Sequence, residues 1–362
     1  MNLPLNTLQF DTDRRTAVDQ AVLLPTGSVP VILVFGDSTS AGADSEKEDL
    51  EDSARIVDGD PYFGREIGWL WNGWLNTTDD GATFEAPDRS GLATSGVGTE
   101  FQRAIGLGGN SAPFSSTAAA NLENVNPIYG LLRGLYGLFR DEETFEVITP
   151  RIIQAARGLT FVGLGESDAE KALSWNGAYL DETPGAPYEA YKTPLTVLKD
   201  QAVAARTSLA GTKSFLVGAF TTAGFVDTKT SNNTDDNSPA TWKAANVGTA
   251  LSGVRVALED SLGVDQFPLV ATGGRKVTTG GNENDYDNLR RADDSLRALA
   301  ENEDMVAVTS QSGLGESRWN PEAGNPHLTG QGSYELGLAW ASAYRNLLAS
   351  NTQLVTAPQF SS

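Results

Sequence analysis

Short apolar segments alternate with longer helical segments along most of the chain, and this alternation limits the possible folds more than any other feature. Residues 31–35, Val-Ile-Leu-Val-Phe, form an uninterrupted apolar run that ends at Gly36. Such a run is typical of a parallel strand that is buried on both faces. Further strands are predicted at residues 101–110, 159–164, 214–219, 267–272 and 305–309, and helices at 188–210, 241–260, 286–302 and 331–348. This order predicts an α/β fold, a three-layer α/β/α sandwich with a central parallel sheet.

The 362 residues contain no internal repeat and no linker of distinct composition. We therefore expect one domain, enlarged by loop insertions, rather than two. The expected division is an N-terminal arm at residues 1–29, the domain at 30–350 with insertions near 43–90 and 111–150, and a C-terminal tail at 351–362. Insertions over the strand ends would set specificity.

The second of these insertions includes a helical pattern with unusual glycine content. Gly130, Gly134 and Gly137 interrupt the apolar residues of segment 117–140, and glycine disfavours a helix. A lid, an oligomer contact and a core helix are all compatible with this pattern. A core helix is the interpretation we favour.

The formal net charge of −21 restricts the partners of this chain. A strongly acidic protein repels phosphate backbones and anionic lipids, so nucleic acid and membrane surfaces are not expected as partners. The absence of cysteine excludes disulfides and cysteine-based chemistry. We expect a soluble chain without a signal peptide or a membrane span, located in the cytoplasm or exported after removal of a targeting segment. No cofactor and no metal site are expected, and the oligomeric state stays open.

The segment Gly36-Asp37-Ser38-Thr39-Ser40-Ala41-Gly42 directly follows the first strand. A serine here can lie at the start of the next helix, where backbone N–H groups stabilise negative charge that develops beside its oxygen. Ser38 is therefore a candidate nucleophile and a backbone oxyanion donor. The alternative is a turn in which Asp37 or Ser38 caps the helix.

His327 is the only histidine in the chain and lies in the segment Asn325-Pro-His-Leu-Thr-Gly330, just before the last predicted helix. A serine nucleophile needs a neighbouring base, and imidazole is the usual one near neutral pH. His327 is thus the candidate base for Ser38. The alternative is a histidine without a catalytic role.

Two further segments are expected to follow strands, and the active site of a parallel sheet lies beyond the carboxyl ends of its strands. Gly109 and Asn110 could contribute to an oxyanion hole, or form an ordinary glycine turn. Glu166, in segment 163–168, could bind substrate, although helix capping by its neighbours would also explain this segment.

Asp37 and Trp69 are the other candidates for substrate binding. Aromatic rings suit sugar rings and acyl groups, and Tyr62, Trp71 and Trp74 lie near Trp69 in the sequence. Core packing is the favoured interpretation of these aromatic residues.

Together these segments resemble the SGNH hydrolases, in particular their sialate O-acetylesterase-like branch with the family-six carbohydrate esterases. The resemblance spans about residues 30–345. It rests on the segments Gly36–Gly42, Ile105–Ser111, Gly163–Asp168, Tyr188–Leu198 and Pro326–Thr329. It implies an α/β/α sandwich of the flavodoxin-like kind, with Ser38 as nucleophile and His327 as base. The implied oxyanion donors are Ser38, Gly109 and residue 164.

The chain departs from this family at two positions. Leu164 stands where the family has Gln or Asn, so a side-chain oxyanion donor is missing, and Asn110 is our candidate replacement. Gly324 stands where the family has Asp, three residues before the histidine. Glu322 could replace that acid and complete a triad, or a dyad could act with a backbone carbonyl orienting the ring.

The leading hypothesis is therefore an esterase of small carboxylic esters, most of all O-acetyl groups on carbohydrates. A small molecule or a carbohydrate ester would be its substrate. The alternatives are a non-catalytic carbohydrate-binding or structural protein on a decayed hydrolase fold, and a lipase or thioesterase.

Overall fold

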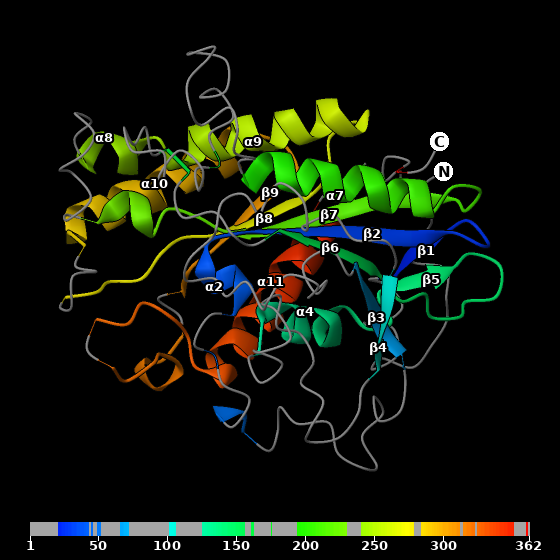
Figure 1. The fold of residues 1–362 in the computed structure, drawn as a ribbon, viewed down its shortest axis with the longest axis horizontal. Coiled ribbons are helices and arrows are strands. Elements are labelled where there is room, and N and C mark those ends of the chain that lie inside the picture. Colours follow the sequence, from blue (N-terminus) through cyan, green and yellow to red (C-terminus); the bar gives the residue numbers. More distant parts are fainter. Residues whose placement is uncertain are drawn as a thin grey trace, which may run out of the picture.

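A seven-stranded sheet forms the middle of the molecule (Figure 1). The computed structural model describes residues 21–42, 45, 49–51, 66–71, 101–105, 125–155, 161–162, 175, 194–229, 240–278, 284–311, 314–322, 324–350 and 360. The strands follow the order β4 (Phe101–Ile105), β3 (Glu66–Trp71), β6 (Arg151–Ala155), β2 (Val29–Gly36), β7 (Ser214–Thr222), β8 (Leu269–Thr272) and β9 (Val306–Thr309). Six of them are parallel, and only the edge strand β4 runs antiparallel to its neighbour.

The central strand β2 explains the layered architecture because its side chains alternate between two cores. Val31, Leu33 and Phe35 belong to one hydrophobic cluster, whereas Ile32 and Val34 belong to the other. Successive side chains of a strand point to opposite faces, so an uninterrupted apolar run requires a covering layer on each side. All five side chains are fully buried.

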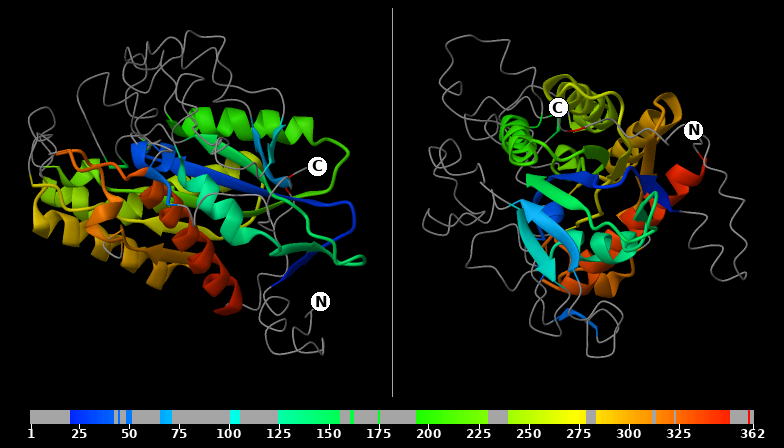
Figure 2. Two further views of the ribbon diagram at one scale, coloured as in Figure 1. Left: turned by 90° about the horizontal axis from the view of Figure 1, so that it is seen from below. Right: turned by 90° about the vertical axis from the view of Figure 1, so that its right-hand side faces the viewer.

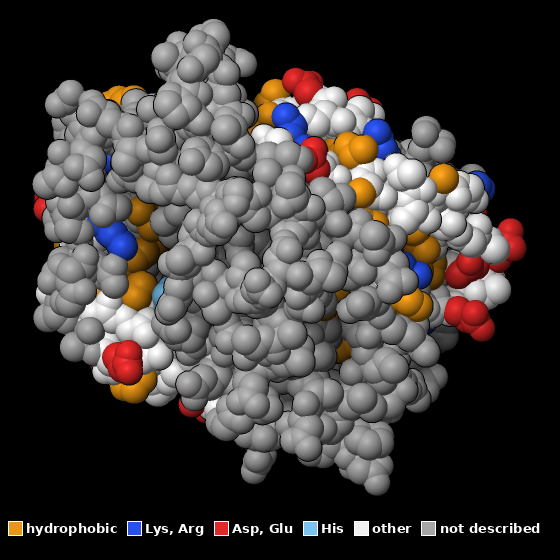
Figure 3. All heavy atoms as spheres, in the orientation of Figure 1, with side chains coloured by type: hydrophobic (Ala, Val, Ile, Leu, Met, Phe, Trp, Pro, Cys, Tyr) orange, Lys and Arg blue, Asp and Glu red, His pale blue; other side chains and the backbone are white. Residues whose placement is uncertain are grey.

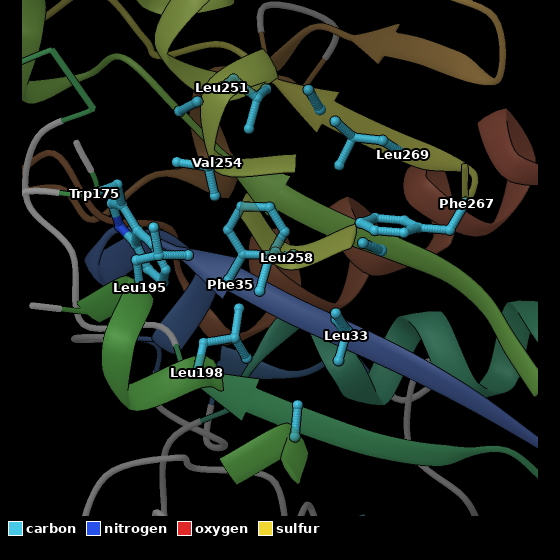
Figure 4. Packing of buried hydrophobic residues seen from close by; sticks show 14 of the residues in the cluster. Leu33, Phe35, Trp175, Leu195, Leu198, Leu251, Val254, Leu258, Phe267 and Leu269 are labelled. Atoms are coloured by element: carbon cyan, nitrogen blue, oxygen red, sulfur yellow. The ribbon is translucent and has the colours of Figure 1, made fainter. Parts of the chain in front are cut away.

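Helices supply both covering layers (Figure 2). On the face of Leu33 and Phe35 lie α7 (Pro194–Ser208), α8 (Ala240–Ala245), α9 (Val247–Leu262) and α10 (Tyr286–Asn302). Figure 4 shows leucines of α7 and α9 packed around Phe35 in this layer. On the face of Ile32 and Val34 lie α4 (Pro127–Leu135) and α11 (Gly330–Ser350). The predicted three-layer α/β/α sandwich is confirmed.

Gly130 and Gly134 lie where α4 crosses α11, whereas Gly137 follows α4 with a φ of +77°. A Cβ on Gly130 would lie 1.9 Å from the carbonyl oxygen of Tyr334, and one on Gly337 would lie 1.9 Å from that of Pro127. The two helix backbones are therefore in direct contact, which only glycine permits at these positions. Glycines disfavour an isolated helix, but here they allow two helices to pack closely, and Pro127–Leu135 form a core helix.

The sequence prediction was wrong about the position of one strand and about the direction of another. Residues 159–164 were expected to form a strand, but Phe161 and Val162 are bends whose N–H groups each donate to the carboxylate of Asp227, at 2.9 Å. The strand of this region is β6, which begins at Arg151, eight residues before the expected start. Of the expected strand 101–110, residues 101–105 form β4, whose antiparallel direction puts its carboxyl end beside the amino end of β3. The carboxyl end of β4 thus lies at the edge opposite to that of the parallel strands.

Parts of the chain expected outside the domain contribute to it. Strand β1 (Val22–Leu24) pairs in parallel with β5 (Phe139–Asp141), so the expected arm contains ordered structure. Phe360, from the expected tail, is 1% exposed within the main hydrophobic cluster, and its N–H donates to the carbonyl of Ser214 at 2.6 Å.

None of the helices in the described ranges combines the length and apolarity that crossing a bilayer requires.

Alanine substitutions at two helical glycines, one inside the contact between α4 and α11 and one outside it, should change stability in opposite directions. We expect Gly337→Ala to lower the free energy of unfolding by about 1–3 kcal/mol, because its methyl group would meet backbone atoms that cannot move independently. Gly253→Ala in α9, where nothing lies within 4 Å of the added Cβ, should instead raise it by about 0.5–1 kcal/mol. Urea unfolding of both variants tests this, and equal stability of the two would contradict the described packing.

Candidate active site

Ser38 lies at a tight turn between β2 and the short helix α2 (Ser38–Ala41). The last residue of β2, Gly36, has a φ of +133° and pairs with Thr222 at the end of β7. A Cβ on Gly36 would lie 2.6 Å from the carbonyl oxygen of Thr222 and 2.9 Å from its nitrogen. The turn therefore requires glycine, and it places Ser38 at the carboxyl edge of the parallel strands, where ligand sites of such sheets lie.

The carboxylate of Asp37 organises this turn from inside the protein. Asp37 is 4% exposed, and its Oδ1 accepts hydrogen bonds from the N–H of Thr39 at 2.9 Å and from the hydroxyl of Thr222 at 2.5 Å. The hydroxyl of Ser40 lies 2.6 Å from the hydroxyl of Thr222 and accepts from the N–H of Thr222 at 3.0 Å. Asp37 thus caps α2, as the alternative interpretation of this segment as a capped turn predicts. It also joins the end of β7 to the end of β2.

Burial dominates the electrostatics of Asp37. Desolvation raises the pKa of this carboxyl above its ordinary value, while the hydrogen bonds from Thr222 and Thr39 and the charge of His327 act in the opposite direction. Lys229 directly follows the 3-10 helix η4 (Val226–Thr228) and is a partly buried cation. Burial lowers the pKa of Lys229, and the charge of Asp37 acts in the opposite direction. Its ammonium lies 5.4 Å from the ring centroid of Phe225.

His327 lies in a loop that two backbone contacts close. Trp319 pairs with Leu328, and the N–H of Asn320 donates to the carbonyl of His327 at 3.0 Å. The N–H of His327 donates to the side-chain oxygen of Asn325 at 2.9 Å. The loop leads directly into α11, and the side chain of His327 is half-buried. The single histidine is visible at the surface beside hydrophobic side chains in Figure 3.

Ser45 connects this loop to the segment that follows α2. Its hydroxyl donates to the carbonyl of Leu328 at 2.7 Å and lies 2.7 Å from the hydroxyl of Ser333. Ser45 itself is buried, and its N–H donates to the carbonyl of Gly42 at 3.3 Å. These contacts join the histidine loop to Gly42, the residue that directly follows α2.

Asp227 binds the two described residues that precede another predicted segment. It is 1% exposed and accepts the two N–H groups of Phe161 and Val162, which directly precede segment 163–168. Glu166 and Leu164 lie outside the described residues, so their roles stay predictions. Sequence reasoning missed Ser45, Thr222, Asp227 and Lys229, because none of them belongs to a recognisable motif and each acts only through tertiary contacts.

The predicted oxyanion and third-acid residues gain no support from the described structure. Gly109 and Asn110 lie outside the described residues, and the strand that precedes them does not lead to the carboxyl edge. Glu322 is exposed, and its carboxylate makes no hydrogen bond or ion pair with the described part of the chain. The third-acid role of Glu322 therefore has no contact to support it.

The structure does not bring Trp69 to this site. Trp69 and Val31 are both level with Arg151 across the sheet, and the guanidinium of Arg151 lies 4.2 Å from the Trp69 ring centroid. Asp37 is six residues beyond Val31, which corresponds to about 20 Å along a strand. Trp69 thus packs near the amino ends of the strands, and packing rather than substrate binding accounts for its place. Within the described ranges, no group of three or more His, Cys, Asp or Glu side chains could hold a metal ion.

No family model and no curated protein matches the sequence at a significant level. Several solved structures resemble the fold. A protein from Arabidopsis thaliana is 12% identical, with 88% of this chain and 98% of that chain covered and a TM-score of 0.47. An inhibitor-bound aryl esterase from M. smegmatis is 12% identical (88% and 100% covered, TM-score 0.40). A carbohydrate acetylesterase from Xanthomonas citri is 11% identical (89% and 57% covered, TM-score 0.44). Similarity at this distance carries no conclusion about chemistry, which must come from the residues of the site.

The buried carboxyl of Asp37 predicts a pH-dependent change in stability. Because its pKa is raised in the folded state, the folded protein binds this proton more tightly than the unfolded chain does. The stabilising contribution is therefore complete at pH below the ordinary value of 3.8 and is lost as the pH rises through the raised pKa. The stability of Asp37→Asn relative to wild type should accordingly increase between about pH 4 and pH 7.

Thermal unfolding of both proteins at these two pH values measures the effect. Asp141→Asn is a control of opposite sign, because hydrogen bonds from the N–H groups of Thr144 and Glu143 help to lower the pKa of Asp141. Its relative stability should fall as the pH rises toward the ordinary value of 3.8, and should change little between about pH 4 and pH 7. A relative stability of Asp37→Asn that is flat or falls with pH would contradict the raised pKa of Asp37.

Proposed function

We propose that this chain hydrolyses small carboxylic esters, with Ser38 as nucleophile and His327 as general base. The observation that carries the proposal is a contact between two segments 283 residues apart, in which the hydroxyl of Ser45 donates to the carbonyl of Leu328, the residue after His327. The only histidine of the chain acts on the carboxyl next to Ser38, and Ser45 ties its loop to the segment beyond α2. Acyl transfer needs an imidazole within hydrogen-bond reach of the serine hydroxyl, and the contact between the two segments supports this pairing.

The proposed reaction proceeds in two steps. His327 takes the proton of the Ser38 hydroxyl as its oxygen attacks the acyl carbon, and then gives that proton to the leaving alcohol. Water, deprotonated by His327, next attacks the acyl-enzyme and releases the carboxylic acid and free Ser38. The backbone N–H of Ser38 at the start of α2, with Gly109 and Asn110 as predicted partners, would stabilise the oxyanion.

O-acetyl groups on carbohydrates are the substrates that we favour. The motif resemblance across Gly36–Gly42, Gly163–Asp168 and Pro326–Thr329 supports this class. Two sequence departures favour a second candidate, a carbohydrate-binding protein without turnover: Leu164 lacks a donor group, and Gly324 provides no acid. A lipase or thioesterase would differ from both in preferring long acyl chains.

Hydrolysis of p-nitrophenyl acetate tests the proposal. We expect Ser38→Ala and His327→Ala each to lower kcat/KM by about a thousand-fold or more, with no further loss in the double variant, because the two side chains act as one unit. Ser208→Ala, an exposed position at the end of α7, controls for a serine-to-alanine change elsewhere. Folded wild-type protein that binds acetylated sugars without turnover would establish the second candidate instead.

A further inference from the structure

We propose that Arg318 holds the loop of His327 in its working position, through an ion pair with Glu51 of the first insertion. This inference rests on the proposed function, because a base works only within hydrogen-bond reach of its nucleophile. Arg318 acts through the loop and not on the substrate, so it is a positioning residue. The first insertion then controls the base as well as specificity.

The backbone of Arg318 lies directly beside the segment that carries the histidine. Its carbonyl accepts hydrogen bonds from the N–H and from the hydroxyl of Thr329, at 3.0 and 3.2 Å. Together with the two backbone contacts that close this loop, these bonds make residues 318–320 a short antiparallel partner of residues 327–329. A displacement of Arg318 is therefore transmitted to His327 through backbone hydrogen bonds.

The first turn of α11 packs against the same carbonyl group. A Cβ on Gly332 would lie 2.1 Å from the carbonyl oxygen of Arg318, so only glycine lets the two segments lie this close. The N–H of Gly332 donates to the hydroxyl of Thr329 at 3.1 Å, and the N–H of Ser333 donates to its carbonyl at 2.9 Å. Because Trp340 anchors α11 in the core, one end of the histidine loop is fixed.

The guanidinium of Arg318 bridges two carboxylates from distant parts of the chain. Its Nη1 lies 2.5 Å from Oε1 of Glu51, and its Nη2 lies 2.8 Å from Oε1 of Glu335 in α11. Gln331 closes the network, since its Nε2 donates to Glu335 at 2.9 Å and its Oε1 accepts from the N–H of Glu51 at 3.0 Å. One arginine thus connects the first insertion, the histidine loop and α11.

The first insertion reaches the histidine loop at two points. Ser45 donates to the carbonyl of Leu328, and Glu51 pairs with Arg318. Leu50 is 6% exposed and belongs to the same hydrophobic cluster as α4 and α11, which fixes the backbone next to Glu51. The contact of Ser45 is between neutral groups, whereas salt screens the pair of Glu51 with Arg318.

The exposure of these charges determines what their loss should change. The exposed fraction of the side chain is 22% for Arg318, 28% for Glu335 and 50% for Glu51. Ion pairs at such exposure contribute little to global stability. Catalysis is more sensitive, because a displacement of about 1 Å can lower a rate by about a hundred-fold. We therefore expect the loss of Arg318 to affect turnover far more than folding.

Kinetics and NMR of the single histidine test the inference. We expect Arg318→Gln to lower kcat for p-nitrophenyl acetate by about ten-fold, with KM within about two-fold of wild type, because the base moves while the substrate site stays. Arg318→Lys keeps a cation for one carboxylate and should lower kcat by only about three-fold. The imidazole signals of His327 should shift or broaden in Arg318→Gln. Arg297→Gln, at an exposed ion-paired arginine of α10, is the matched control and should change neither measurement.

Folded Arg318→Gln with an unchanged histidine spectrum would overturn the proposal whatever its activity, and so would an equal loss of kcat in Arg318→Lys. If Arg318→Gln does not fold, Glu51→Gln decides the question, since it removes only the half-exposed partner. Altered histidine signals in Glu51→Gln support the proposal, and unaltered signals overturn it. The NMR result does not require turnover, so a failed esterase assay and a failed inference are distinguishable.

Discussion

A buried carboxylate joins the ends of two neighbouring strands, and the candidate site depends on this junction. Asp37 accepts hydrogen bonds from the turn that starts α2 and from Thr222 at the end of β7. Gly36 lets the two backbones approach so closely that no other residue would fit. Because both strands are fixed in the sheet, the position of Ser38 follows from the packing of the core.

A buried charge at this place opposes stability. The desolvation that raises the pKa of Asp37 is a cost to folding, which the surrounding hydrogen bonds and the nearby cations offset only in part. A similar tension exists between α4 and α11, where glycines that weaken each helix allow the backbones to touch. In both cases a locally unfavourable residue is retained because a tertiary contact requires it, and sites of this kind are where local sequence rules are expected to fail.

The sequence predicted best those helices and strands whose spacing of apolar residues follows directly from which of their faces are buried. The apolar run at 31–35 is the centre of β2, and α10 (Tyr286–Asn302) has the predicted bounds. The segment at 159–164 was misjudged because Phe161 and Val162 are buried without pairing in a sheet. Their N–H groups donate instead to Asp227, more than 60 residues later. The direction of β4 was equally out of reach, since strand pairing depends on a partner distant in the chain.

The sequence by itself determined the alternation that leads to a layered α/β fold, and it limited the possible base to one histidine. The periodicity of apolar residues predicts the layered fold, and the presence of a single histidine limits the choice of base. Only the tertiary structure decided that Trp69 lies far from Asp37, that Ser45 ties the histidine loop in place, and that Asp37 is buried beside Thr222. Burial and through-space electrostatics depend on distances between segments, and no local pattern of residues encodes those distances.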